Sequence, residues 1–336
     1  MAAYTTIDDP TAYFKVQLYT GTGSSNAITF DDTDTDMQPD VVWIKVRSEV
    51  NNHELYDSVR GATKRLIPDL TSVEDTNTAG LTAFGSDGFT VNTSHATNKS
   101  SGTFVAWCWK ESATAGFDIV SFTGNGTDDR DISHSLSAVP HFMVTRSRVD
   151  VEAWVTYHHK NTSAPETDFL LLNATQATTD NATIWSDEAP TSSVFTVGAD
   201  NSTNGNTDAI ITYLWSEKQG FSRFGSYTGN GNADGPFVYL GFRPAWLMVK
   251  HTGATQGWEI WDNKRSSYNA GGELLAANSS AAERSNSTWA SLDFLSNGFK
   301  IRYNDALNNS SGSTYIYMAF AEAPFVNSEG VPCNAR

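Results

Sequence analysis

The chain has 336 residues and a formal net charge of −16, from 22 Lys and Arg against 38 Asp and Glu. Phosphate backbones attract the opposite charge and no basic run exceeds two residues, so nucleic acid is excluded as an expected partner. The sequence also lacks an apolar run of about eighteen residues and a basic-then-apolar start, so we expect no membrane insertion and no signal peptide.

The chain order predicts a leader, three copies of one unit and a tail. The leader covers residues 1–13 and is short and polar, and we predict that it is a docking arm. The copies cover residues 14–113, 117–218 and 221–323, and the tail covers residues 324–336. Linkers of a few residues favour a stiff rod or a closely packed array over flexibly joined domains. A unit of about 100 residues suffices for a core of its own, so we expect each copy to be able to fold alone.

Five short patterns, recurring three times in the same order, define these copies. An aromatic residue runs into a Gly turn, a proline precedes an apolar strand that ends in a base, and an aromatic pair follows. A Phe-centred strand and an aromatic closing strand complete each copy. The Gly turns cover residues 19–23, 122–126 and 227–231, and the proline-led strands cover 39–45, 140–146 and 244–250. The aromatic pairs cover residues 53–56, 154–157 and 258–261. The Phe-centred strands cover residues 88–91, 194–197 and 298–301, and the closing strands cover 103–109, 209–215 and 314–320.

This organisation predicts an all-β protein of three tandem antiparallel β-sandwich domains, of jelly-roll or lectin-like type. The proline-led runs are apolar at nearly every position, so we expect them to be interior strands. Helical periodicity is almost absent, and short helical turns are predicted only at residues 71–75 and 279–284.

Aromatic side chains are the first candidate site. Trp154, Tyr157, Trp258 and Trp261 have the chemistry to stack on sugar rings, which suggests a ligand-binding surface. Because their positions recur in register, the alternative is that they are core residues required by every copy. The sequence favours the core interpretation.

The second candidate is a calcium loop at Asp32, Asp34 and Asp36, whose alternating carboxylates resemble oxygen ligands. The alternative is a solvated acidic loop, because the EF-hand glycine and distal glutamate are missing and the other copies have no such run. His158 and His159 do not suggest a metal pair, since neighbours on a strand point to opposite faces. No cofactor is expected, although calcium stays open.

No motif of a hydrolase nucleophile, a phosphate loop or a paired-carboxylate cleft recurs at equivalent positions, so we expect no enzymatic activity. Residues 41–47, 53–66, 84–91 and 104–110 resemble a repeat domain of uncharacterised type found in tail-fibre and other structural proteins of marine bacteriophages. Copy two is similar through residues 122–126, 133–136 and 190–198, and copy three is a looser match. The resemblance implies a virion structural protein and supplies no catalytic residues.

We therefore expect a bacteriophage tail fibre or receptor-binding component that mediates attachment to the host. Expected partners are other tail proteins, further copies of the chain in a homo-oligomer, for which a trimer is predicted, and a glycan or protein of the host surface. One alternative is a capsid or tail decoration protein that binds only virion subunits, and another is a carbohydrate-active depolymerase. Copy three departs most from the shared pattern, and we predict that it faces the host while the leader docks.

Overall fold

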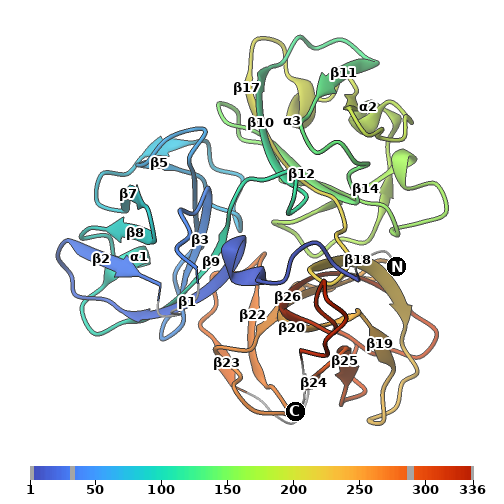
Figure 1. Ribbon diagram of the computed structural model, residues 1–336. Helices are drawn as coiled ribbons and strands as arrows, with labels where there is room; N and C mark the ends of the chain where they lie inside the picture. The colour runs from blue at the N-terminus through green and yellow to red at the C-terminus, as the bar shows by residue number, and fades with distance from the viewer. Residues whose placement is uncertain (1–3, 31–34, 286–290, 334–336) are drawn as a thin grey trace.

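The computed structural model describes residues 4–30, 35–285 and 291–333, and nearly all regular structure in it is antiparallel strand. The all-β prediction is confirmed. Figure 1 shows three lobes around a common centre, which we call lobe 1 (residues 14–109), lobe 2 (117–215) and lobe 3 (222–324). None of the helices in the described part of the chain is long and apolar enough to cross a membrane.

Each lobe packs a main sheet against a smaller one, as in a β-sandwich. In lobe 1 the main sheet has the order β1 (Phe14–Thr20), β9 (Thr103–Trp109), β3 (Val41–Val46), β4 (Glu54–Asp57), the smaller sheet is β2 (Asn26–Thr29), β8 (Gly88–Val91), β7 (Leu81–Gly85), and β5 (Lys64–Arg65) pairs with β6 (Asp75–Thr76). In lobe 2 the orders are β10 (Phe117–Thr123), β17 (Ala209–Trp215), β12 (Phe142–Ser147), β13 (Val155–His158), β14 (Asp168–Leu171), β15 (Thr179–Asp180), and β11 (Arg130–Ser133), β16 (Val194–Val197). In lobe 3 they are β18 (Ser222–Thr228), β26 (Thr314–Pro324), β20 (Phe242–His251), β21 (Trp258–Asp262), β22 (Glu273–Ala276), β23 (Arg284–Ser285), and β19 (Phe237–Tyr239), β25 (Gly298–Ile301), β24 (Leu292–Leu295).

The helices are short and begin at capping residues. They are α1 (His95–Asn98), α2 (Ala182–Trp185) and α3 (Asn201–Asn204), with single 3-10 turns at η1 (Pro10–Ala12) and η2 (Pro165–Thr167). The helical turns predicted at residues 71–75 and 279–284 are wrong. Neither segment is helical, and the backbone of each bonds to another lobe: the Glu74 N–H donates to the carbonyl oxygen of Arg148 at 2.8 Å, and the Glu283 N–H to that of Arg47 at 2.9 Å.

The strands of the proline-led runs are interior strands, as predicted. Every residue of β3 and β12 is buried, and so is nearly all of β20. Strand register makes the three equivalent: Val41 pairs with Trp109, Phe142 with Trp215 and Trp246 with Phe320. One face of each strand packs against the smaller sheet of its own lobe, and the other face packs at the centre of the molecule, so both faces must be apolar.

A single central core joins the lobes. It contains the inward-facing side chains of all three main sheets, including Trp107 and Trp109 from lobe 1, Tyr213 and Trp215 from lobe 2, and Phe320 from lobe 3. A lobe on its own would expose this face to water, at a cost of about 25 cal/mol per Å² of apolar surface. The packing therefore does not support the expectation that each copy folds alone, and we expect the lobes to unfold as one cooperative unit.

Hydrogen bonds close the lobes into a ring rather than a rod. Trp154 of lobe 2 donates its indole N–H to the carbonyl oxygen of Ile67 in lobe 1 at 3.0 Å. The equivalent Trp258 of lobe 3 donates to the carbonyl oxygen of Leu171 in lobe 2 at 2.8 Å. His53 of lobe 1 stands at the same position, and its Nε2 lies 3.1 Å from the carbonyl oxygen of Ala276 in lobe 3. Of the two arrangements that short linkers allowed, the structure has the closely packed one.

Ion pairs distinguish the three junctions, which we call the 1/2, 2/3 and 3/1 junctions after the lobes they join. At the 1/2 junction, Asp57 binds Arg60 at 2.5 Å and accepts the Tyr213 hydroxyl of lobe 2 at 2.6 Å. At the 3/1 junction, Asp262 binds Arg265 at 2.5 Å and accepts the Trp107 indole N–H of lobe 1 at 3.0 Å. Lobes 1 and 3 thus share one ion pair at equivalent positions.

Lobe 2 is the copy that departs from this pattern. His158 and Asn161 stand where the other lobes have the Asp–Arg pair. His158 bonds through Nε2 to the carbonyl oxygen of Tyr317 in lobe 3 at 3.1 Å, and Asn161 accepts the hydroxyl of Thr178 at 2.7 Å. The prediction that copy three diverges most is therefore wrong at this position.

A buried asparagine explains the recurring Gly turn. In lobe 2, Asn204 accepts the Asn125 N–H at 3.0 Å and donates to the carbonyl oxygens of Thr127 and Gly198 at 2.7 and 3.1 Å. Asn98 and Asn309 make the corresponding bonds in lobes 1 and 3. A Cβ at Gly124 would lie 2.0 Å from a backbone oxygen, so the first glycine is required by close approach.

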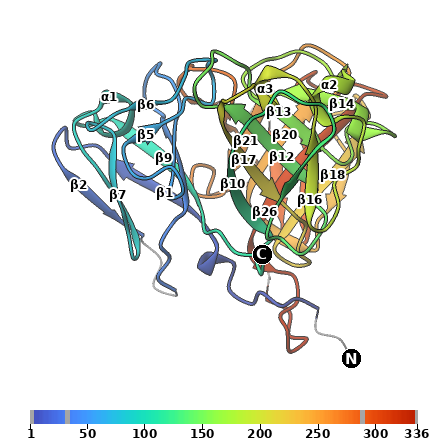
Figure 2. The same cartoon turned by 90° about the horizontal axis from the view of Figure 1, so that it is seen from above.

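The leader and the tail lie at the same end of the molecule (Figure 2). Ile7 is 3% exposed and belongs to the central core, while the Thr5 hydroxyl donates to the carbonyl oxygen of Gln219 at 2.8 Å. Asp8 accepts the Ser328 N–H of the tail at 2.7 Å. The described part of the leader is therefore packed against the lobes and the tail. Its role as a docking arm stays a prediction.

Candidate functional site

All four aromatic residues proposed as a sugar-stacking surface are interior. Trp154 and Trp258 are 0% and 2% exposed in the central core, and Tyr157 and Trp261 are 4% and 0% exposed in the cores of lobes 2 and 3. Stacking requires an exposed ring face, so the ligand-binding interpretation of these residues is wrong. Their recurrence in register comes from packing.

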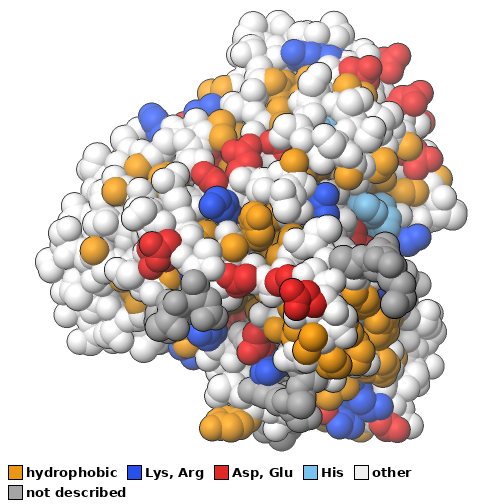
Figure 3. Space-filling view, viewed as in Figure 1, with side chains coloured by type: hydrophobic (Ala, Val, Ile, Leu, Met, Phe, Trp, Pro, Cys, Tyr) orange, Lys and Arg blue, Asp and Glu red, His pale blue; other side chains and the backbone are white. Residues whose placement is uncertain are grey.

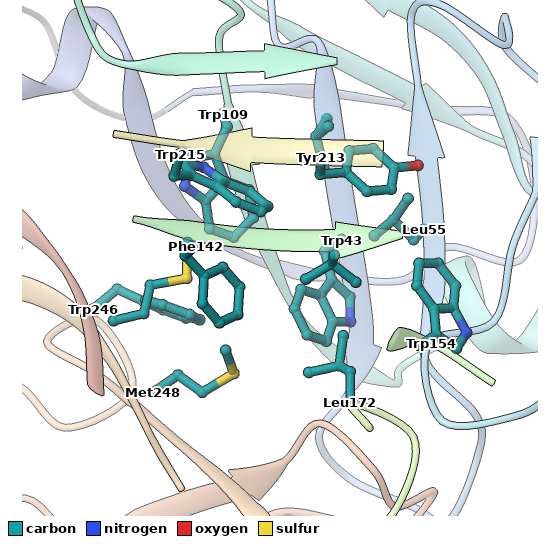
Figure 4. Close-up of a pocket in the computed structure, with 13 residues that line it drawn as sticks. Trp43, Leu55, Trp109, Phe142, Trp154, Leu172, Tyr213, Trp215, Trp246 and Met248 are labelled. Carbon is teal, nitrogen blue, oxygen red and sulfur yellow. The ribbon is translucent and has the colours of Figure 1, made fainter. Parts of the chain in front are cut away.

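The centre of the ring holds only a small void. Figure 4 shows Trp43, Trp109, Trp215, Trp246 and Phe142 converging on it from the three main sheets. The cavity measures about 30 Å³ and its lining is apolar. That volume is close to what one or two waters occupy, and an apolar cavity of this kind stays dry. The central core is therefore a structural feature and leaves no room for a ligand.

The acidic loop is only partly visible. Asp32 and Asp34 lie outside the described residues, and Asp36 is exposed. Within residues 4–30, 35–285 and 291–333, no group of three or more His, Cys, Asp or Glu side chains is placed to hold a metal ion. The described residues thus provide no alternative metal site.

An exposed aromatic pair on lobe 3 is the best candidate for a binding surface. Phe237 and Tyr239 lie on β19, the edge strand of the smaller sheet, and are 46% and 47% exposed. The residue between them, Val238, packs into the core of lobe 3, so both aromatic rings point to the outer face. We call this face, with its neighbours Leu295, Gly298 and Lys300, the lobe 3 platform.

Comparison among the lobes shows that the fold does not require these aromatics. The smaller sheet of every lobe places a buried aliphatic residue at the position of Val238: Ile28 in lobe 1 and Ile132 in lobe 2. The two flanking, outward positions hold Ala27 and Thr29 in lobe 1, Asp131 and Ser133 in lobe 2, and Phe237 and Tyr239 in lobe 3. Small or polar residues satisfy the sheet at this place, so the packing of the sheet does not account for the aromatic pair in lobe 3.

The platform is closely packed beneath its aromatic rings and has charged groups at its edge. Tyr239 pairs in register with Gly298, where a Cβ would lie 3.2 Å from the Phe237 ring and 2.0 Å from the carbonyl oxygen of Val238. Glycine is therefore required here by the close approach of β19. Lys300 pairs with Asp234 at 2.8 Å beside Phe237, and the Arg223 guanidinium lies 6.0 Å from the Tyr239 ring centre.

The platform lies at the end that carries the termini. The Tyr4 hydroxyl of the leader donates to the carbonyl oxygen of Gly241 at 2.8 Å and lies 3.3 Å from the Tyr239 hydroxyl. Figure 3 shows apolar side chains gathered over lobe 3 on this face.

The lobes also differ in charge. Residues 221–323 contain 8 basic and 8 acidic side chains, whereas residues 117–218 contain 5 basic and 14 acidic side chains. Lobe 3 is therefore electrically neutral in an acidic protein.

Sequence reasoning missed the platform because it looked for aromatics that recur. The sequence signal of the platform is a pair of aromatic residues that does not recur. Phe237 and Tyr239 alternate with an aliphatic residue, and the equivalent positions of the other copies hold Ala, Thr, Asp and Ser. A recurring aromatic belongs to the shared core, and a non-recurring aromatic at an outward strand position is free to bind a partner.

Comparison with known families identifies one match. A family described as a domain of unknown function (DUF7483) matches residues 9–324, a span that includes all three lobes and the last five residues of the leader. No curated protein matches the chain. The span treats the three lobes as one domain, in agreement with the central core that they share.

Proposed function

The chain belongs to the family of the DUF7483 domain, and we propose that it is a non-enzymatic bacteriophage virion protein, a tail fibre or receptor-binding component that attaches to the host surface. The resemblance of its copies to a repeat of marine phage structural proteins supports the virion assignment. The exposed pair Phe237 and Tyr239 carries the attachment role, because lobe 3 alone displays such a pair on its smaller sheet.

The closed ring supports a role in binding. Its interior is filled by the central core, so partners must be recognised on the outside, and the cross-lobe bonds hold the platform on a rigid body. Rigid presentation lowers the entropy lost on binding. The predicted partners remain other tail proteins, a host glycan or protein, and further copies in a trimer.

A cell-binding experiment tests the proposal. Fluorescently labelled protein is titrated onto host cells, and the wild type is compared with the variant Phe237→Ala/Tyr239→Thr, which copies Ala27 and Thr29 of lobe 1. We expect binding to weaken at least about tenfold with little change in melting temperature, because two exposed aromatics each contribute on the order of 1 kcal/mol or more to a surface contact. Val151→Ser, at a valine of lobe 2 that is 70% exposed, is the matched control. Equal binding by both variants and the wild type would contradict the proposal.

A decoration role predicts a different outcome. A protein that binds only virion subunits would not bind cells, and the platform variant would instead reduce incorporation into particles. The same two variants, measured for incorporation, therefore separate the two functions.

A further inference from the structure

Histidines occupy two of the three junctions of the ring. At the 2/3 junction, His158 and His159 of lobe 2 bond through Nε2 to the carbonyl oxygens of Tyr317 and Phe224 in lobe 3, at 3.1 and 2.8 Å. At the 3/1 junction, His53 bonds through Nε2 to the carbonyl oxygen of Ala276 in lobe 3 at 3.1 Å. None of the seven histidines makes a hydrogen bond across the 1/2 junction in the described structure.

The geometry fixes two of these rings in the neutral form. Nε2 of His158 faces a carbonyl oxygen and must carry a proton, while its Nδ1 accepts the Lys160 N–H at 3.0 Å. In His53, Nε2 likewise faces a carbonyl oxygen and Nδ1 accepts the Trp43 indole N–H at 2.9 Å. A charged imidazole has a proton on both nitrogens and needs two acceptors, so protonation breaks the bond at Nδ1.

The surroundings of both rings also oppose a positive charge. His158 is 1% exposed, with His159 and His141 beside it, and Lys160, Lys218, Arg223 and Glu217 are the charged groups around this cluster. His53 is fully buried and faces Lys45 and, across the junction, Arg265, while its backbone N–H donates to Asp69 at 2.9 Å. Burial lowers the pKa of His53 and of His158 to about 3 and that of His159 to about 4.

The two junctions with histidines are the ones that hold lobe 3. The 1/2 junction relies instead on Asp57 with Tyr213, and on Glu74, which binds Arg148 of lobe 2 at 2.8 Å and Arg60 at 3.2 Å. At the 2/3 junction the corresponding contact is uncharged, from the Thr178 N–H to the carbonyl oxygen of Thr252 at 2.8 Å. At the 3/1 junction, Glu283 with Arg47 and Arg265 still provides ion pairs.

We propose that mild acid loosens lobe 3 from the ring, first at the 2/3 junction and then at the 3/1 junction, while lobes 1 and 2 stay joined. A histidine whose pKa is lowered in the closed junction stabilises that junction fully when the pH is above the pKa of a free histidine, near 6.5. This stabilisation is lost progressively as the pH falls below that value. Each such histidine then favours the open junction by about tenfold per pH unit. The inference is independent of the attachment role.

Hydrogen exchange of the full chain at pH 7 and pH 5, corrected for the intrinsic rate, tests the proposal. Amides that bond at the 2/3 junction, such as that of Thr178, should exchange at least about tenfold faster at pH 5, whereas that of Glu74 at the 1/2 junction should not change. The variant His158→Asn should lower the acceleration at the 2/3 junction by about tenfold and leave the share due to His159, whereas His95→Asn, at an exposed histidine of lobe 1, should retain it in full. Equal acceleration at the 1/2 junction, or none at the 2/3 junction in the wild type, would overturn the proposal whether or not the variant folds.

Discussion

Removing the hydroxyl of Tyr213 tests whether the lobes are energetically joined. This hydroxyl belongs to lobe 2, is buried, and donates to the Asp57 carboxylate of lobe 1 at 2.6 Å. A hydrogen bond to a charged group is worth about 1.5 to 3 kcal/mol, so Tyr213→Phe should lower the free energy of unfolding by about 2 kcal/mol. With an unfolding entropy of about 2.1 cal/mol/K per residue, a cooperative unit of this size should melt about 3 °C lower.

The assay is calorimetry with a double-mutant cycle. Tyr157→Phe is the matched control, because the Tyr157 hydroxyl is in the same lobe and makes no hydrogen bond within the described residues. Combining Tyr213→Phe with Asp57→Asn should show a coupling energy of about 1 kcal/mol or more, since both changes remove the same bond. If the lobes separated first and then melted independently, the bond between Tyr213 and Asp57 would already be broken when each lobe unfolded. Removing the bond would then leave the melting temperature unchanged. A melting temperature within about 0.5 °C of the wild type, or additive double-mutant energies, would refute the shared-unit interpretation.

Three further outcomes follow from the packing. Ile7→Ala should lower the free energy of unfolding by about 2 to 4 kcal/mol in urea denaturation, because the side chain is buried in the central core; a loss below about 0.5 kcal/mol would show that the leader is dispensable. Asn204→Ala removes the five side-chain hydrogen bonds that Asn204 makes around the recurring turn and should cost about 3 kcal/mol or more in the same assay, whereas Asn92→Ala, with one exposed bond, should cost about 1 kcal/mol or less; equal losses would contradict a stabilising role of the buried asparagine. Thermal scans should show the melting temperature rising between about 10 and 300 mM NaCl, since screening reduces the repulsion within a chain of net charge −16; a flat or falling curve would contradict this.

The sequence predicted the strand content and the interior position of the proline-led strands because apolar periodicity reports burial directly. It did not predict the partner of the second apolar face. The apolar run at residues 41–46 would have the same sequence whether its second face packed against another chain or against another copy in the same chain. Only the structure shows that this face packs in the central core. The alternative of a closely packed array was open, and the cross-lobe bonds of Trp154 and Trp258 select it.

The candidate site was harder to predict than the fold. The sequence favoured the core over a sugar-stacking surface for Trp154 and Trp258, and both are buried. It did not predict that each indole N–H donates to a carbonyl of the neighbouring lobe. Phe237 and Tyr239 were not considered, since an exposed aromatic on one copy breaks no pattern within that copy. The looser match of copy three also did not indicate that Asp262 and Arg265 form the same ion pair as Asp57 and Arg60.

The position of the protein in the virus particle tests the proposed function most directly. Antibodies raised against the purified chain and coupled to gold are applied to intact particles and viewed by electron microscopy. A tail attachment protein predicts label at the tail. Label distributed over the head lattice, or particles without label, would contradict the attachment role.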